Sequence, residues 1–137
     1  MRVVLDTNVV LSGVFFGGVP GEILSAWNRG HFDVVVSSEV LDEYERAGAA
    51  LAEGKPSLQE AWAPVMRWIV ENALIVDAED LGEDVSADPD DDVFLACAVA
   101  GGARVIISGD RHLKAVSGWR GILVLPPRRF HDDFLRT

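Results

Sequence analysis

Short β-branched runs alternate with longer, helix-sized segments along the whole chain, and this alternation limits the possible folds more than any other feature. The runs lie at residues 2–5, 33–36, 74–76, 104–107 and 122–125. The segments typical of helices lie at residues 20–29, 38–51, 57–72 and 88–100. Because parallel strands need crossovers of helical length, the pattern predicts a central, mainly parallel sheet between two layers of helices, a three-layer α/β/α sandwich.

The predicted strands at residues 34–36 and 105–107 are apolar without interruption, as expected for strands covered on both faces. A chain of 137 residues with 49% hydrophobic content is long enough to bury one core, so we expect a single domain over residues 1–137. The alanine- and glycine-rich stretch at residues 48–56 fits the pattern least well. We expect a frayed helix end or a loop there.

The composition predicts a cytoplasmic protein with no membrane partner. The longest apolar run, Val93–Ala100, is far shorter than the roughly 20 residues that a membrane-spanning helix needs. Asp6 stands where a secretory signal would have its apolar segment. Cys97 is the one cysteine, so no intramolecular disulfide forms, and its apolar neighbours indicate a buried side chain rather than a nucleophile.

The charge argues against a protein that coats nucleic acid by bulk attraction, because such domains are usually basic and this chain has a formal net charge of -10. The charge is also uneven: residues 1–103 contain 5 Lys/Arg and 19 Asp/Glu, and residues 104–137 contain 7 and 3. This distribution suits an enzyme that binds a cation with carboxylates and contacts phosphates elsewhere. An unevenly charged surface without a function has the same composition.

Two aspartates closely follow predicted strands. Asp6 follows residues 3–5 directly, and Asp110 follows residues 105–107 after a Ser-Gly turn. Ligands of open α/β sheets bind beyond the carboxyl ends of the strands, so both carboxylates would share one crevice if these strands are neighbours. The alternative is structural, with Asp6 capping the next segment and Asp110 stabilising a turn.

The helix predicted from residue 38 contains several acidic residues, which helical geometry separates. Its apolar stripe is formed by Val40, Leu41, Tyr44, Ala47 and Leu51. At about 100° per residue, Glu43 lies at the edge of this stripe and Asp42 lies on the opposite side. Glu39 and Glu45 lie farther from the stripe centre than Glu43. Because a functional acid must be held beside the packed face, Glu43 is the candidate of this helix.

Four aspartates and a proline at residues 88–92 open the most apolar predicted helix. Helix capping and the helix dipole explain one or two of these acids. Four acids close together repel one another, and a bound divalent cation would relieve that repulsion. Asp91 shares a helical face with the apolar residues that follow, whereas Asp90 and Asp92 are turned about 100° to either side. Asp91 is therefore the acid directed inward.

Four motifs, in this order, resemble those of the PIN domains, which occur in toxin nucleases of bacterial and archaeal toxin–antitoxin systems and in some RNA-processing factors. The matching segments are Leu5–Asn8, Ser37–Tyr44, Asp88–Ala98 and Ser108–Asp110. Residues 11–32 also resemble the branch formed by toxin components, the VapC-like ribonucleases. Ser108 stands where many members have threonine, a change that keeps the hydroxyl group.

The resemblance implies a PIN-like fold and hydrolysis of RNA phosphodiester bonds. The residues it implies as both metal ligands and catalytic groups are Asp6, Glu43, Asp91 and Asp110. It implies that Asn8 and Ser108 support this site by hydrogen bonds. The partners it implies are an RNA substrate and a cognate antitoxin protein, and a homo-oligomer is possible.

Carboxylate oxygens without a cluster of histidine or cysteine favour Mg²⁺ or Mn²⁺ over zinc. Hydrolysis by a metal-activated water would leave a 5′-phosphate and a 3′-hydroxyl. Because RNA phosphates must approach four acids, cations are needed nearby. Arg111 and Lys114, beside Asp110, are the expected substrate-binding residues.

Two other classes of function remain open at this stage. The first is a catalytically inactive PIN-like scaffold that binds RNA or a protein, which loss of any site acid would favour. The second is a flavodoxin-like or receiver-like phosphotransfer domain, which also gathers aspartates at strand ends. That class requires a lysine after a late strand, and this chain has Ser108-Gly109-Asp110 at that place.

Overall fold

The computed structural model describes residues 1–136 and contains one five-stranded sheet in which all strands are parallel. The strands are β1 (Arg2–Leu5), β2 (Asp33–Val36), β3 (Leu74–Ile75), β4 (Val105–Ile107) and β5 (Leu123–Leu125). Their spatial order is β3-β2-β1-β4-β5, so β1 is central and β4 is its neighbour. All five predicted strands are present, and the sheet is entirely rather than mainly parallel.

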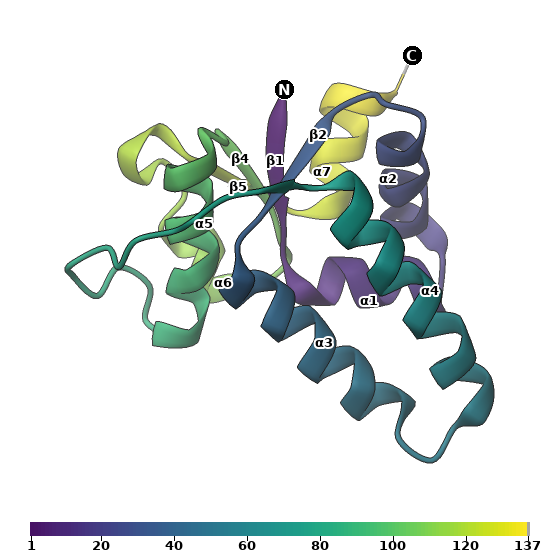
Figure 1. Cartoon of the computed structure of the whole chain (residues 1–137). Helices are drawn as coiled ribbons and strands as arrows, with labels where there is room; N and C mark the ends of the chain where they lie inside the picture. The colour runs from purple at the N-terminus through teal and green to yellow at the C-terminus, as the bar shows by residue number, and fades with distance from the viewer. Residues whose placement is uncertain (137) are drawn as a thin grey trace.

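Helices cover both faces of the sheet. The longer ones are α1 (Thr7–Phe15), α2 (Gly18–Asn28), α3 (Ser38–Ala52), α4 (Pro56–Asn72) and α5 (Asp92–Gly101). The shorter ones are η1 (Pro89–Asp91), α6 (Arg111–Ala115), η2 (Trp119–Gly121), α7 (Pro127–Phe130) and η3 (His131–Leu135). Figure 1 shows α5 on one side of the sheet and α2, α4 and α7 on the other. The architecture is the three-layer α/β/α sandwich that the sequence predicts.

The short helices α6, η2, α7 and η3 were not predicted, and two of the longer helical segments also differ from the prediction. The helix α1 was not expected, because its β-branched residues and Gly13 have low helix propensity. Packing overrides that propensity, since α1 buries Val9, Val10 and Leu11 in the core, next to α2 and α3. The helix predicted at residues 88–100 is in fact a 3-10 turn, η1, followed by α5.

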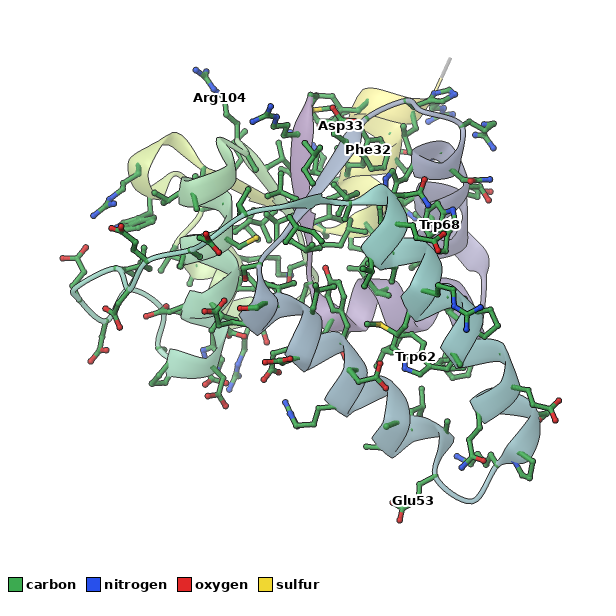
Figure 2. The ribbon with its side chains drawn as sticks, viewed as in Figure 1. Phe32, Asp33, Glu53, Trp62, Trp68 and Arg104 are labelled. Carbon is green, nitrogen blue, oxygen red and sulfur yellow. The ribbon has the colours of Figure 1, made fainter. Side chains whose placement is uncertain are left out.

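The stretch at residues 48–56 is mostly helical, and the expected fraying is absent there. The helix α3 continues to Ala52, and the turn to α4 occupies only residues 53–55. Gly48 has a packing role, because a Cβ atom built on it would lie 2.1 Å from the ring of Trp62. Figure 2 shows Trp62 between the two helices of this hairpin, with Glu53 at its tip. The missing side chain of Gly48 thus lets the indole pack against α3.

The core closes around the central strands and fixes α3 beside the end of β1. Tyr44 is 1% exposed, and its hydroxyl donates a hydrogen bond of 2.6 Å to the carbonyl of Leu5. Burial raises the pKa of Tyr44 well above its ordinary value. Cys97 is buried as expected, and burial raises the pKa of its thiol to about 11.

Among the residues described, no single helix is long and apolar enough to cross a membrane. Within residues 1–136, the pair α1 and α2 is long and apolar enough when taken together, but it is bent by 96° at the break between the two helices.

Candidate active site

Asp6 lies at the carboxyl end of β1, where the chain turns into α1. Its backbone N–H donates to the carbonyl of Ile107 at 3.0 Å, which ties the end of β1 to the end of β4. Asp6 occupies the N-cap position of α1, yet its side chain makes no capping hydrogen bond. The carboxylate instead accepts a hydrogen bond of 2.6 Å from Ser108 Oγ. Capping therefore does not explain this side chain.

The surroundings of Asp6 disfavour its charge. The residue is 6% exposed, and burial raises the pKa of its carboxyl group, an effect that the hydrogen bond from Ser108 partly offsets. The negative charge of Asp110 raises the pKa further. A buried carboxylate with a second carboxylate nearby is a local charge excess that a cation would balance.

Asp110 follows β4 and begins α6, and it has a structural role as well as a place in the site. Its Oδ1 accepts the backbone N–H groups of His112 at 2.8 Å and Leu113 at 3.1 Å. Burial opposes ionisation, but these two N–H donors, together with smaller favourable interactions such as that with His112, lower the pKa of Asp110. Ser108 Oγ also accepts the backbone N–H of Asp110, so one hydroxyl links Asp6 to Asp110.

Asp91 is the last residue of η1, immediately before α5, and it belongs to the same group of acids. Its Oδ2 is buried and receives no hydrogen bond from any described residue. Burial, followed by the charges of Asp110 and Asp88, raises the pKa of Asp91 to about 7. The negative charge of Asp110 therefore favours the protonated form of Asp91. The charge of Asp6 also raises the pKa of Asp91, so the three aspartates interact electrostatically.

The aspartates beside Asp91 are accounted for by local structure. Asp88 caps η1 by accepting the N–H of Asp90 at 3.0 Å. Asp92 accepts the N–H groups of Val85 at 3.0 Å and Ser86 at 2.8 Å, which attaches the preceding loop to α5. Asp91 is the inward-facing acid of this run with a buried oxygen that lacks a donor. This matches its predicted direction.

Glu43 is the predicted acid that the structure keeps apart from the other three. Its carboxylate pairs with Arg46 at 2.6 Å, one turn along α3, and both side chains are partly exposed. It immediately precedes Tyr44, whose hydroxyl bonds to Leu5 next to Asp6. Glu43 thus belongs to the turn of α3 that packs beside the end of β1, but its carboxylate is directed to Arg46.

The donor atoms fit a hard divalent cation. Within residues 1–136, no three acidic, histidine or cysteine side chains are already close enough to hold an ion together. However, Asp91 Oδ2 is buried and undonated, and Asp6 and Asp110 add carboxylate oxygens to the same field. Such oxygens are the ligands that Mg²⁺ and Mn²⁺ prefer, and an unpaired buried carboxylate is unfavourable without one.

The family model of the PIN domain matches residues 2–112, a span that includes the three aspartates and Glu43. The chain belongs to the PIN domain family. Its fold is similar to a chain in the crystal structure of VapBC2 from Rickettsia felis bound to a DNA fragment from their promoter. That likeness has a TM-score of 0.64 at 16% identity and covers 92% of this chain and 98% of the other. A comparison with curated proteins gave no match.

The remaining predicted residues of this PIN domain differ in their contacts. Ser108 is fully buried and donates a hydrogen bond to Asp6, the residue that the family resemblance implies it supports. Asn8 is exposed in the first turn of α1, and the described residues form no side-chain hydrogen bond with it. Arg111 and Lys114 are exposed on α6 and follow Asp110 in the sequence.

Sequence reasoning did not single out Thr7 within the PIN site. Thr7 is buried beside Asp6, and its Oγ1 has no hydrogen-bond partner among the described residues. A hydroxyl directly after a strand-end acid was the signal that could have identified it. The backbone N–H of Thr7 also lowers the pKa of Asp6.

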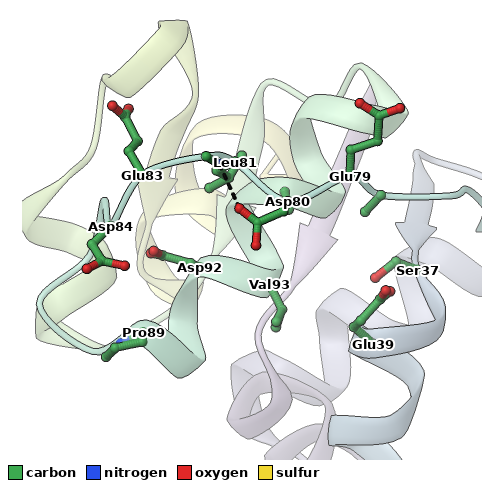
Figure 3. A pocket seen from close by; sticks show the side chains of 13 residues that line it. Ser37, Glu39, Glu79, Asp80, Leu81, Glu83, Asp84, Pro89, Asp92 and Val93 are labelled. Carbon is green, nitrogen blue, oxygen red and sulfur yellow. Dashed lines mark hydrogen bonds between the residues drawn. The ribbon is translucent and has the colours of Figure 1, made fainter.

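A hollow of the PIN domain lies against the first turn of α5 and is a separate feature. Its volume is about 660 Å³, and it is bounded by the loop at residues 78–84, by α5 and by Glu39. Figure 3 shows the acidic side chains of the loop spread around its rim. Asp80 accepts the N–H of Gly82 at 2.7 Å, and Asp92 is occupied as described above. These acids stabilise the loop and leave the three-aspartate group as the candidate site.

Proposed function

We propose that this PIN domain is a divalent-metal-dependent endoribonuclease and the toxin of a toxin–antitoxin pair. The observation that carries the proposal is the buried, undonated Oδ2 of Asp91 beside Asp6 and Asp110. A folded chain gains nothing from such an arrangement by itself, because unpaired buried charge is destabilising. Binding of a cation gives it a function.

In this proposal Asp6, Asp91, Asp110 and Glu43 hold Mg²⁺ or Mn²⁺. A bound ion would supply a water molecule of lowered pKa and would neutralise charge on the leaving oxygen of the phosphodiester. The products then carry a 5′-phosphate and a 3′-hydroxyl. Ser108 orients Asp6 by donating a hydrogen bond to its carboxylate, and the support proposed for Asn8 acts at the same turn.

Glu43 must leave Arg46 to join the other three acids. The pair is partly exposed, with side-chain exposures of 31% for Glu43 and 70% for Arg46. Exposed ion pairs contribute only about 0–1 kcal/mol, so a bound cation can outcompete the arginine. Once released, Arg46 is a further cation at this edge of the sheet.

Arg111 and Lys114 are proposed to attract the RNA backbone. Both are exposed on α6, which starts at Asp110. An acidic chain repels RNA at long range, so local cations beside the site are needed to position phosphates.

The proposed protein partner is a cognate antitoxin, and the proposed location is the cytoplasm, where such an enzyme would find RNA. The support is the fold shared with a chain of the VapBC2 complex and the match to the PIN family. A homo-oligomer is compatible with this proposal. A small DNA-binding protein encoded beside this gene would further support it.

The test is cleavage of total cellular RNA by the purified protein with Mn²⁺. We expect 5′-phosphorylated fragments, no cleavage in chelator and no cleavage by Asp6→Asn, which keeps the shape of the side chain and removes a ligand charge. Asp132→Asn is the control, because Asp132 is exposed near the C-terminus, and it should cut like the wild type. Cleavage that persists in chelator or in Asp6→Asn would refute the proposal. Metal binding without any cleavage would favour the inactive scaffold.

A further inference from the structure

A second hollow, with a volume of about 540 Å³, lies at the opposite edge of the sheet, where the strands begin. We call it the arginine pocket. The residues that line it include Val99, Gly102, Arg104, Arg120 and Ile122. Its walls are the end of α5, the start of β4 and the turn η2, so it is separate from the three aspartates at the carboxyl edge.

Pairing of β4 with β5 brings the two arginines to this pocket. Arg104 precedes β4, and its carbonyl accepts the N–H of Leu123 at 2.8 Å, so the turn that contains Arg120 is held beside it. Figure 2 shows Arg104 extending outward from the end of the molecule that also carries Asp33. The fold thus places two cations that are 16 positions apart in the sequence at the same pocket.

Arg120 has an unusual backbone. It is the one residue other than glycine with a positive φ among those described, at φ 50° and ψ 27°. A left-handed conformation in a residue with a Cβ atom is unfavourable and persists where the surroundings require it. The guanidinium of Arg120 lies over the ring of Trp119, 4.5 Å from its centroid, which holds the charge in place.

Neither pocket arginine has an anionic partner in residues 1–136, although the chain has an excess of acids. Arg2, the third arginine nearby, is used differently, because it donates to the carbonyl of Gly101 at 2.9 Å and so caps α5. Asp33 is in register with Arg2 across β1 and β2. Arg104 and Arg120 therefore keep their hydrogen-bond donors available.

We propose that the arginine pocket binds a nucleotide, with Arg104 and Arg120 contacting its phosphoryl group. Guanidinium groups offer paired N–H donors that match phosphate oxygens. Val99 and Ile122 add an apolar part to the wall, and the volume is in the range of small-ligand sites rather than that of a single anion. The nucleotide is either free or one unit of an RNA chain. The proposal does not depend on the nuclease activity.

The test is calorimetric titration of the full chain with adenosine 5′-monophosphate, a short single-stranded RNA and inorganic phosphate, all in chelator. Under these conditions metal-dependent hydrolysis is off, so failure of the nuclease proposal would not affect the result. We expect the nucleotide or the RNA to bind more tightly than phosphate. Binding of the RNA alone would mean that the pocket takes one nucleotide unit of an RNA chain. Binding of both ligands would mean that the pocket accepts a free nucleotide as well as a unit of RNA.

The variants are Arg104→Gln and Arg120→Gly, with Arg67→Gln as the matched control. Each pocket variant should weaken binding at least about tenfold, because a hydrogen bond to a charged group is lost. Glycine adopts positive φ readily, so Arg120→Gly should melt no lower than the wild type. Arg67 is exposed on α4, and its removal changes the net charge equally without touching the pocket.

Three outcomes would overturn the proposal. The first is no binding of the nucleotide or the RNA. The second is an equal loss in Arg67→Gln, which would mean bulk electrostatics. The third is phosphate binding as tight as nucleotide binding, which would mean an adventitious anion only.

Discussion

At the scale of single residues, Asp91 keeps a buried oxygen without a donor while Asp88 and Asp92 on either side accept backbone N–H groups. Burial raises the pKa of Asp91 to about 7, whereas an aspartate in an unfolded chain titrates near about 4. The folded state therefore binds the proton more tightly than the unfolded state. As a result, the contribution of Asp91 to stability is complete below about pH 4 and declines as the pH rises to about 7.

Replacing Asp91 with asparagine should remove this penalty. In chelator at pH 8, Asp91→Asn is expected to melt at a higher temperature than the wild type, because the neutral amide avoids burying a charge beside Asp110. The gain should shrink toward pH 5, where the wild-type carboxyl is already protonated. Thermal melts across this pH range measure it. Asp90→Asn, at an exposed neighbouring position, should show no such trend, and a lower melting temperature for Asp91→Asn at pH 8 would contradict the argument.

Glu43 and Asp42 are adjacent on α3 and give a second test of single residues. Glu43→Gln should weaken Mn²⁺ binding at least about tenfold, since a charged contact contributes about 1.5–3 kcal/mol. Asp42→Asn should leave the affinity nearly unchanged, because Asp42 is exposed. Calorimetric titration of both variants with Mn²⁺ decides the matter. Equal effects would mean that the helical-face argument does not identify a ligand.

The sequence allowed the positions of Asp6, Asp110 and Asp91 to be predicted because each depends on a local rule. Two follow strands, and the third faces inward on a helix whose capping is visible in the sequence. The contact between Glu43 and Arg46 was not predictable in this way, since an exposed pair in a helix is decided by side-chain rotamers. The link from Ser108 to Asp6 spans 102 positions, and without the family resemblance no local pattern indicates it.

At the scale of secondary structure elements, the buried strands were the most predictable parts. Val34–Val36 and Val105–Ile107 are apolar throughout because both faces are covered, and β-branched side chains favour extended backbone. The helix α1 escaped prediction since its composition is similar to that of a strand, and tertiary packing decided its conformation. The hairpin of α3 and α4 was predicted only in part. A glycine within a helix usually signals its end, whereas Gly48 lies inside α3 and makes room for Trp62.

The hairpin itself gives the next prediction. Gly48→Ala should destabilise the protein by about 1–3 kcal/mol, because the new methyl group would collide with the indole of Trp62. Helix propensity acts in the opposite direction by about 1 kcal/mol, so a gain in stability would show that Trp62 moves away easily. Urea unfolding measures the difference. Ala49→Leu, at the next and exposed position, should stay within about 0.5 kcal/mol of the wild type.

At the scale of the whole molecule, the fold separates its charges along the strands. Acids gather at the carboxyl edge, where β1 and β4 end, and two arginines without anionic partners lie at the opposite edge. A net charge of -10 adds general repulsion to the local excess at the acidic edge. A cation bound there is expected to reduce the free energy of the folded chain more than that of the unfolded chain, in which the four acids are dispersed.

Mn²⁺ or Mg²⁺ should therefore raise the melting temperature, and chelator should reverse the rise. At a metal concentration of 100 times the dissociation constant the stabilisation is about 2.7 kcal/mol, which for a domain of this size corresponds to about 10 °C. The quadruple variant with asparagine or glutamine at Asp6, Glu43, Asp91 and Asp110 should lose this response while remaining folded. Zn²⁺ and Na⁺ at matched ionic strength separate selective binding from screening, because screening acts on every exposed charge and does not need these four residues. A rise in melting temperature that survives in the quadruple variant would place the cation elsewhere, with the acidic hollow at residues 78–84 as the next region to mutate.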